Sequence, residues 1–114
     1  MDFKTREESD GKVVVIECPV RVDSGGAQDL REIMTESTER DKFLLVVDMD
    51  KTEFMDSSGL GALVSRIAVT RSNSGDVRLA RVKDPILKLL ELTHLDKIFQ
   101  SFESVQTAVD SFDV

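Results

Sequence analysis

The sequence has few of the residues from which catalytic and metal sites are usually built. Among 114 residues there is one cysteine, Cys18, and one histidine, His94. A lone cysteine cannot form an internal disulfide or a cysteine-cluster metal site. The histidine lies near the end of an expected helix, where an ordinary helix-end residue is a simpler interpretation than a catalytic base. We therefore expect no catalytic residue, no bound metal and no cofactor.

Long apolar runs and an excess of positive charge are also absent. No stretch of about 18 apolar residues occurs, so no membrane-spanning helix is expected, and residues 1–4 lack a signal-peptide pattern. The 15 basic residues are outnumbered by 22 acidic ones, which gives a net charge of −7. That charge disfavours nucleic acid or an anionic membrane surface as a partner. Together these features predict a cytoplasmic protein.

What is present is an alternation of strand and helix patterns. At 40% apolar residues, the chain can build one core. Asp10-Gly11 is a hairpin-type turn dipeptide between two strand patterns. The expected elements, in chain order, are strands at 2–8 and 12–16, a helix at 27–39, a strand at 43–47, a helix from 60 to about 72, a strand at 77–82, a helix at 85–92, a strand at 98–99 and a helix at 105–112. This order predicts one α/β domain over residues 1–114, with a mostly parallel small sheet edged by the N-terminal hairpin, about four helices and no internal repeat.

Several details of these elements are also predicted. Asp23 or Ser24 should cap the first helix, and Asp84 should cap the helix that has Pro85 at its first position. The latter helix should be well buried through its apolar residues, Ile86, Leu87, Leu89, Leu90 and Leu92.

The chain is organised around residues 43–61. Five apolar residues, Phe43 to Val47, predict a strand buried on both faces. Apolar residues with helical spacing follow, at Leu60, Leu63, Val64, Ile67 and Ala68. Between them, Asp56-Ser57-Ser58 is placed at a helix N-terminus, where four backbone N–H groups lack partners within the helix.

Two interpretations of Ser57 and Ser58 remain open from the residues alone. One serine could simply cap the helix, which contributes about 1 kcal/mol. Alternatively a serine accepts phosphate, because a helix N-terminus stabilises an anion. Gly59 and Gly61 each lower helix propensity by about 1 kcal/mol relative to alanine. Two glycines in one turn therefore favour a contact surface for a partner.

Patterns typical of enzymes fit poorly. No Gly-x-Ser-x-Gly elbow, dinucleotide fingerprint or Walker lysine motif is present. An apolar strand ending in Asp48-x-Asp50-x-Thr52 resembles the first motif of haloacid-dehalogenase phosphatases. The resemblance covers nine residues, the chain is too small for that fold, and the later lysine and acidic pair are not evident. We interpret Asp48 and Asp50 as strand-end and loop residues and expect no enzyme activity.

The segment Phe54-Met55-Asp56-Ser57-Ser58-Gly59-Leu60-Gly61 resembles the signature of the STAS family, specifically the bacterial anti-sigma factor antagonists. The resemblance extends over nearly the whole chain, from the opening hairpin to Ile98-Phe99. It implies a partner-switching regulator: the unphosphorylated protein binds an anti-sigma factor that is also a serine kinase, and a sigma factor is released. Phosphorylation of the first serine after the aspartate, here Ser57, ends binding, and a serine phosphatase reverses it.

The same resemblance implies a contact surface around the acceptor. Its members here are Asp23, Asp56, Ser57, Ser58, Gly59, Leu60 and Gly61. The sequence departs from the family where Gly-Glu-apolar-Asp is common, since it has Val20-Arg21-Val22-Asp23. The alternative is a non-switching STAS scaffold or adaptor subunit of a signalling or transport complex. The free protein is expected to be a monomer or a weak dimer.

Overall fold

The computed structural model describes residues 2–114 and contains a five-stranded sheet in the order β1-β2-β4-β6-β7. Strands β1 (Lys4–Glu8) and β2 (Val13–Glu17) form an antiparallel hairpin at one edge. The remaining neighbours, β4 (Leu44–Asp48), β6 (Asp76–Ala80) and β7 (Ser101–Phe102), pair in parallel. The α/β class and the mostly parallel sheet edged by the hairpin are confirmed.

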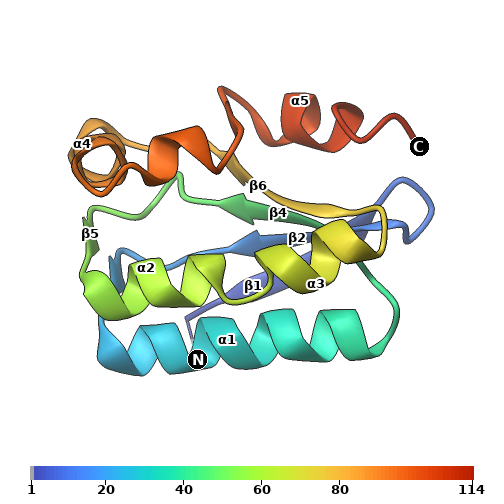
Figure 1. Ribbon diagram of the computed structural model, residues 1–114, viewed down its shortest axis with the longest axis horizontal. Helices are drawn as coiled ribbons and strands as arrows, with labels where there is room; N and C mark the ends of the chain where they lie inside the picture. The colour runs from blue at the N-terminus through green and yellow to red at the C-terminus, as the bar shows by residue number, and fades with distance from the viewer. Residues whose placement is uncertain (1) are drawn as a thin grey trace.

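The central strand β4 is buried on both faces, as its apolar run predicts. Leu45, Val46 and Val47 are fully buried. Helices α1 (Ser24–Glu39), α2 (Ser57–Val64) and α3 (Ile67–Ser72) cover one face, and α5 (Val105–Asp110) covers the other. Figure 1 shows these layers on either side of the sheet. Alternate residues of β2 and β4 thus enter two apolar clusters, a large one under α1 and α2 and a small one under α5.

All four expected helical segments are present, but the second is broken in two. Helix α2 ends at Val64 and α3 begins at Ile67. The Ser65 hydroxyl donates to the Ala62 carbonyl at 2.6 Å, and Arg66 has φ −118° and ψ 12°, outside the helical region. Ala68, expected on the apolar stripe, is consequently exposed.

The predictions for α4 (Asp84–Leu92) were partly wrong. Ile86 and Leu90 are buried, whereas Leu87 and Leu92 are 36% and 80% exposed, because only one face of this helix packs on the domain. The N-cap is Lys83, without a side-chain hydrogen bond, and Asp84 is the first helical residue, so Asp84 does not cap α4.

The last strand was also misplaced. Strand β7 occupies Ser101–Phe102, three residues beyond the predicted start of the strand at Ile98. The 3₁₀ helix η1 (Leu95–Lys97) precedes it, Ile98 is exposed, and Phe99 enters the large core. The apolar pair Ile98-Phe99 therefore reflects the burial of Phe99 in the core, and these two residues do not form a strand of the sheet.

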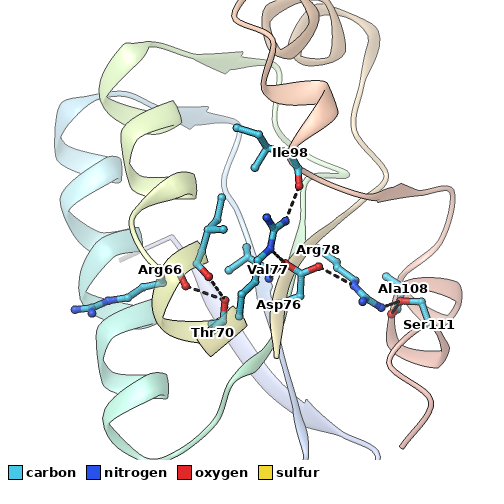
Figure 2. Close-up of polar contacts among 10 residues, drawn as sticks. Arg66, Thr70, Asp76, Val77, Arg78, Ile98, Ala108 and Ser111 are labelled. Carbon is cyan, nitrogen blue, oxygen red and sulfur yellow. Dashed lines mark hydrogen bonds and ion pairs between the residues drawn. The ribbon is translucent and has the colours of Figure 1, made fainter. Parts of the chain in front are cut away.

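A buried carboxylate connects the two faces of the sheet at the start of β6. Asp76 accepts hydrogen bonds from Arg71 Nε at 2.9 Å and Arg78 Nε at 3.1 Å (Figure 2). Arg71 also donates to the Ile98 carbonyl, and Arg78 donates to Ser111 Oγ at 2.7 Å. These bonds join α3 and the residues before β7 to the end of α5. Such a network of charge-assisted hydrogen bonds fixes the end of the sheet where β6 begins.

Candidate functional site

The predicted signature lies beyond the carboxyl ends of the sheet strands, in a small structure of its own. Strands β3 (Arg21–Val22) and β5 (Phe54–Met55) pair in parallel, with Arg21 opposite Phe54 and Val22 opposite Met55. Each strand runs through one aspartate into a helix, β3 into α1 and β5 into α2. Figure 1 shows the two helices side by side, starting at the same end of the molecule.

Asp56, and neither serine, caps α2. Its Oδ1 accepts from the backbone N–H of Ser58 at 3.0 Å and of Gly59 at 3.1 Å. The Asp56 backbone is extended, with φ −102° and ψ −172°, as expected of an N-cap. The interpretation of a serine as the cap was therefore wrong. The Asp56 carboxylate also occupies two of the backbone N–H groups that the sequence analysis expected to be free for an anion, those of Ser58 and Gly59.

The two serines differ in their surroundings. Ser57 is exposed at the first helical position, and within residues 2–114 its hydroxyl makes no hydrogen bond. Ser58 is half-buried. Asp23, also exposed, caps α1 by accepting from the Gly26 N–H at 3.3 Å, which confirms the first of the two expected caps. The structure thus places Asp23 and Ser57 on neighbouring helix ends with their polar groups at the surface.

The two glycines of the signature have separate roles. A Cβ on Gly59 would lie 2.5 Å from Met55 Cγ and 2.8 Å from the Val22 carbonyl oxygen. Gly59 is buried and lets α2 pack against the β3–β5 pair, so a contact surface is not the reason for this glycine. Gly61 is half-buried instead, and a Cβ there would meet only the Arg31 guanidinium, at 2.8 Å.

Leu60, the other buried member of the predicted contact set, is 6% exposed and belongs to the large core. Exposed residues that sequence reasoning did not select lie on the paired strands β3 and β5 and directly before β3. Arg21 stacks on the Phe54 ring, 4.1 Å from its centroid, and Val20 and Phe54 are 50% and 38% exposed. An aromatic residue that immediately precedes the Met-Asp-Ser-Ser segment was the available signal.

The phosphatase-like aspartate has a structural role. Asp48 is 1% exposed, and its two oxygens accept from Arg81 Nε at 3.1 Å and Nη2 at 2.7 Å. The same hydrogen bond raises the pKa of Arg81. Asp50 is exposed in the following turn, and its backbone N–H donates to Asp48. A buried carboxylate held by a guanidinium and a backbone N–H ends the strand, as the strand-end interpretation expects.

Cys18 and His94 are the remaining residues that the sequence analysis considered. Cys18 is buried, and burial, followed by the nearby Asp48 and Glu17 carboxylates, raises the pKa of its thiol, which therefore stays protonated. His94 lies exposed in a left-handed conformation just after α4. Within residues 2–114, no group of three or more potential ligands is placed to hold a metal ion. None of the helices in that range is long and apolar enough to cross a membrane.

Comparison with known proteins places this arrangement in a family. The chain is 24% identical over 115 residues to the anti-sigma F factor antagonist of Paenibacillus polymyxa, and the match covers all of this chain and 98% of that protein. A crystal structure of a putative anti-sigma factor antagonist from Thermotoga maritima superposes with a TM-score of 0.86 at 20% identity, covering 98% of this chain and 95% of that one. The structure of the phosphorylated form of the Bacillus cell fate determinant SpoIIAA superposes with a TM-score of 0.77 at 18% identity, and the match covers 96% of this chain and 97% of that one. The family model of the STAS domain matches residues 4–108, and the chain belongs to the STAS domain family.

Proposed function

We propose that this protein is an anti-sigma factor antagonist that acts by partner switching, with Ser57 as the phosphoacceptor. In its unphosphorylated form it binds an anti-sigma factor that is also a serine kinase, so that a sigma factor is released. Phosphorylation of Ser57 ends this binding, and a serine phosphatase restores the binding form. The protein does this in the cytoplasm and catalyses no reaction itself.

The observation that carries the proposal is the position of Ser57. It is exposed at the start of α2, while the capping role falls to Asp56. The Ser57 hydroxyl is thus presented to solvent on a helix end whose backbone is held by Asp56 and by the close packing of Gly59. A hydroxyl that the fold does not use, on a rigid support, suits a kinase substrate.

Electrostatics support the direction of the switch. A phosphate adds about −1.5 to −2 charges at neutral pH. It would stand next to the Asp56 carboxylate, which already occupies the N–H groups of Ser58 and Gly59. A partner that covers this helix end must therefore desolvate two anionic groups side by side, and repulsion and desolvation oppose the complex.

The proposed contact surface includes Asp23, Asp56, Ser57, Ser58 and Gly61. We add the stacked pair of Arg21 and Phe54, since exposed aromatic and arginine residues are typical anchors of interfaces. Gly59 and Leu60, which are buried, support this surface from beneath.

Phosphosite mapping tests the proposal. The purified protein is incubated with ATP, Mg²⁺ and an anti-sigma factor kinase encoded by the same genome, then digested with trypsin. Cleavage after Lys51 and Arg66 gives one peptide that contains Ser57 and Ser58, and fragment masses separate the two. We expect phosphate on Ser57 and none in Ser57→Ala. Phosphate on Ser58, Thr52 or Ser24, or no phosphate with any such kinase, would contradict the proposal and favour a non-switching STAS adaptor.

A further inference from the structure

The guanidinium of Arg31, an exposed residue of α1, lies against α2 at Gly61. A Cβ on Gly61 would stand 2.8 Å from Arg31 Nη2, so the guanidinium occupies the space that a side chain at position 61 would fill. Within the described residues no carboxylate lies within ion-pair distance of Arg31, and no hydrogen bond engages its guanidinium. Glu32, Glu36 and Glu39 line a depression together with Arg31, yet none of them forms an ion pair with it, so its charge is available to another anionic group.

The position of Gly61 relative to Ser57 supplies one. The two residues are four apart within α2, so they are neighbours on one face of the helix, with Cβ positions about 5–6 Å apart. A phosphate on Ser57 Oγ extends from that face. The Arg31 guanidinium lies at Gly61, one helical turn from Ser57, and both the Arg31 and Ser57 side chains are exposed. Arginine binds phosphate through paired, charge-assisted hydrogen bonds of about 2.7–2.9 Å.

We propose that Arg31 binds the phosphate on Ser57 within the same molecule. The site is the pair of helices α1 and α2, its ligand is a phosphoserine dianion, and Gly61 is the residue that gives the guanidinium room. The clamp gives the phosphate a counter-charge at a helix end where Asp56 already occupies the Ser58 and Gly59 N–H groups. Phosphorylation also removes Arg31 from the surface offered to a partner. This inference rests on the proposed phosphorylation of Ser57.

The second arginine nearby helps to single out Arg31. Arg31 and Arg66 line a shallow depression of about 310 Å³ between α1 and the α2–α3 junction, together with Thr35 and Ser65. Arg66 is already engaged, because its Nε and Nη2 donate to Thr35 Oγ1 at 3.3 and 2.8 Å. Of the two arginines that line this depression, Arg31 is therefore the one whose guanidinium has no hydrogen-bond partner among residues 2–114.

The test uses full-length protein with phosphoserine incorporated at position 57 by genetic code expansion. The ³¹P resonance is followed by NMR from pH 4 to pH 8, at low and high salt. A nearby guanidinium favours the dianion and lowers the midpoint of the titration. We expect Arg31→Gln to raise that midpoint by about 0.5 pH units, a modest value because the site is exposed. Gly61→Ala should raise it too without changing charge, because the new Cβ displaces the guanidinium.

Arg40→Gln is the matched control, since Arg40 is an exposed residue at the far end of the same helix. Arg40→Gln should leave the titration midpoint within about 0.1 pH units of that of the phosphoprotein without further substitution. Arg31→Lys keeps the positive charge and should therefore raise the midpoint less than Arg31→Gln does. Equal midpoints for all variants, or equal shifts for Arg31→Gln and Arg40→Gln, would overturn the clamp. Because the phosphate is installed without a kinase, that result is independent of whether a kinase ever modifies Ser57.

Discussion

The chain builds the same unit twice, and the two copies lie side by side. Residues Arg21-Val22-Asp23-Ser24-Gly25-Gly26 and Phe54-Met55-Asp56-Ser57-Ser58-Gly59 each form two strand residues, a capping aspartate and the first turn of a helix. In both, the aspartate accepts from the N–H of a glycine three residues later, at 3.3 Å in the first unit and 3.1 Å in the second. Both place a serine at the exposed first position of the helix.

The units differ in how closely they are packed. Asp23 is exposed and its carboxylate accepts one backbone hydrogen bond, whereas Asp56 is half-buried and accepts two. A Cβ on Gly26 would meet its nearest atom at 3.4 Å, in contrast to the overlap at Gly59. The same motif thus supports two helix ends, of which the second is held more firmly. Of the two exposed serines that begin these helices, Ser57 therefore stands on the more firmly held backbone.

The largest expected effect on stability separates the two glycines. Gly59→Ala forces a methyl group against Met55 and a backbone carbonyl, and overpacking of this kind costs about 1–3 kcal/mol. Gly26→Ala meets only ordinary contacts and should stay within about 0.5 kcal/mol of the wild type. Urea unfolding monitored by circular dichroism gives both values, at a constant m-value. Equal destabilisation by Gly59→Ala and Gly26→Ala would contradict the claim that the second unit is packed more closely than the first.

The capping aspartate of the second unit comes next. Asp56→Ala leaves the N–H groups of Ser58 and Gly59 without their acceptor, and we expect a loss of about 1–2 kcal/mol in the free energy of unfolding. Asp56→Asn keeps an acceptor of similar capping strength and should lose much less. If the alanine and asparagine variants unfolded at the same urea concentration, the cap would not be what holds this helix end.

A smaller effect is expected in the first unit. Asp23→Ala removes one longer hydrogen bond at an exposed position, which predicts a loss of about 0.5–1 kcal/mol. Thermal unfolding of Asp23→Ala and Asp56→Ala measured side by side sharpens the comparison. A loss at Asp23 as large as that at Asp56 would show that the units are equivalent in stability.

Much of this architecture follows from the sequence. The apolar run of β4, the Asp10-Gly11 turn and the Asp23 cap have local signals, and each was predicted. The repeated unit was not predicted, and the sequence analysis expected no internal repeat. Its two copies share only the aspartate, the following serine and the glycine at the third helical position. The pairing of β3 with β5, which makes the repeat visible, joins residues far apart in the chain.

The misplaced features share a physical reason. Whether Leu92 is buried depends on which face of α4 the rest of the domain covers, and the apolar pattern of an isolated helix cannot decide that. Asp76 and Arg78 lie two residues apart on a strand, yet their roles depend on Arg71 and Ser111 from other elements. At the candidate site, the aspartate and serine were evident from the signature. Arg31, which comes from another helix, left no signal in it.

The central claim, that a charge at Ser57 switches off a partner, is tested most directly by titration calorimetry against a purified anti-sigma factor kinase without ATP. Ser57→Ala should bind like the wild type and remain folded, because Asp56 supplies the cap. Ser57→Asp places a second negative charge beside Asp56, and the interface must desolvate it. We expect the binding free energy to become less favourable by about 2–5 kcal/mol, which lowers the affinity by roughly 30-fold to several thousand-fold. Ser72→Asp, exposed at the end of α3, should retain wild-type affinity. Equal affinities for wild type, Ser57→Ala and Ser57→Asp would place Ser57 outside the interface and contradict the account.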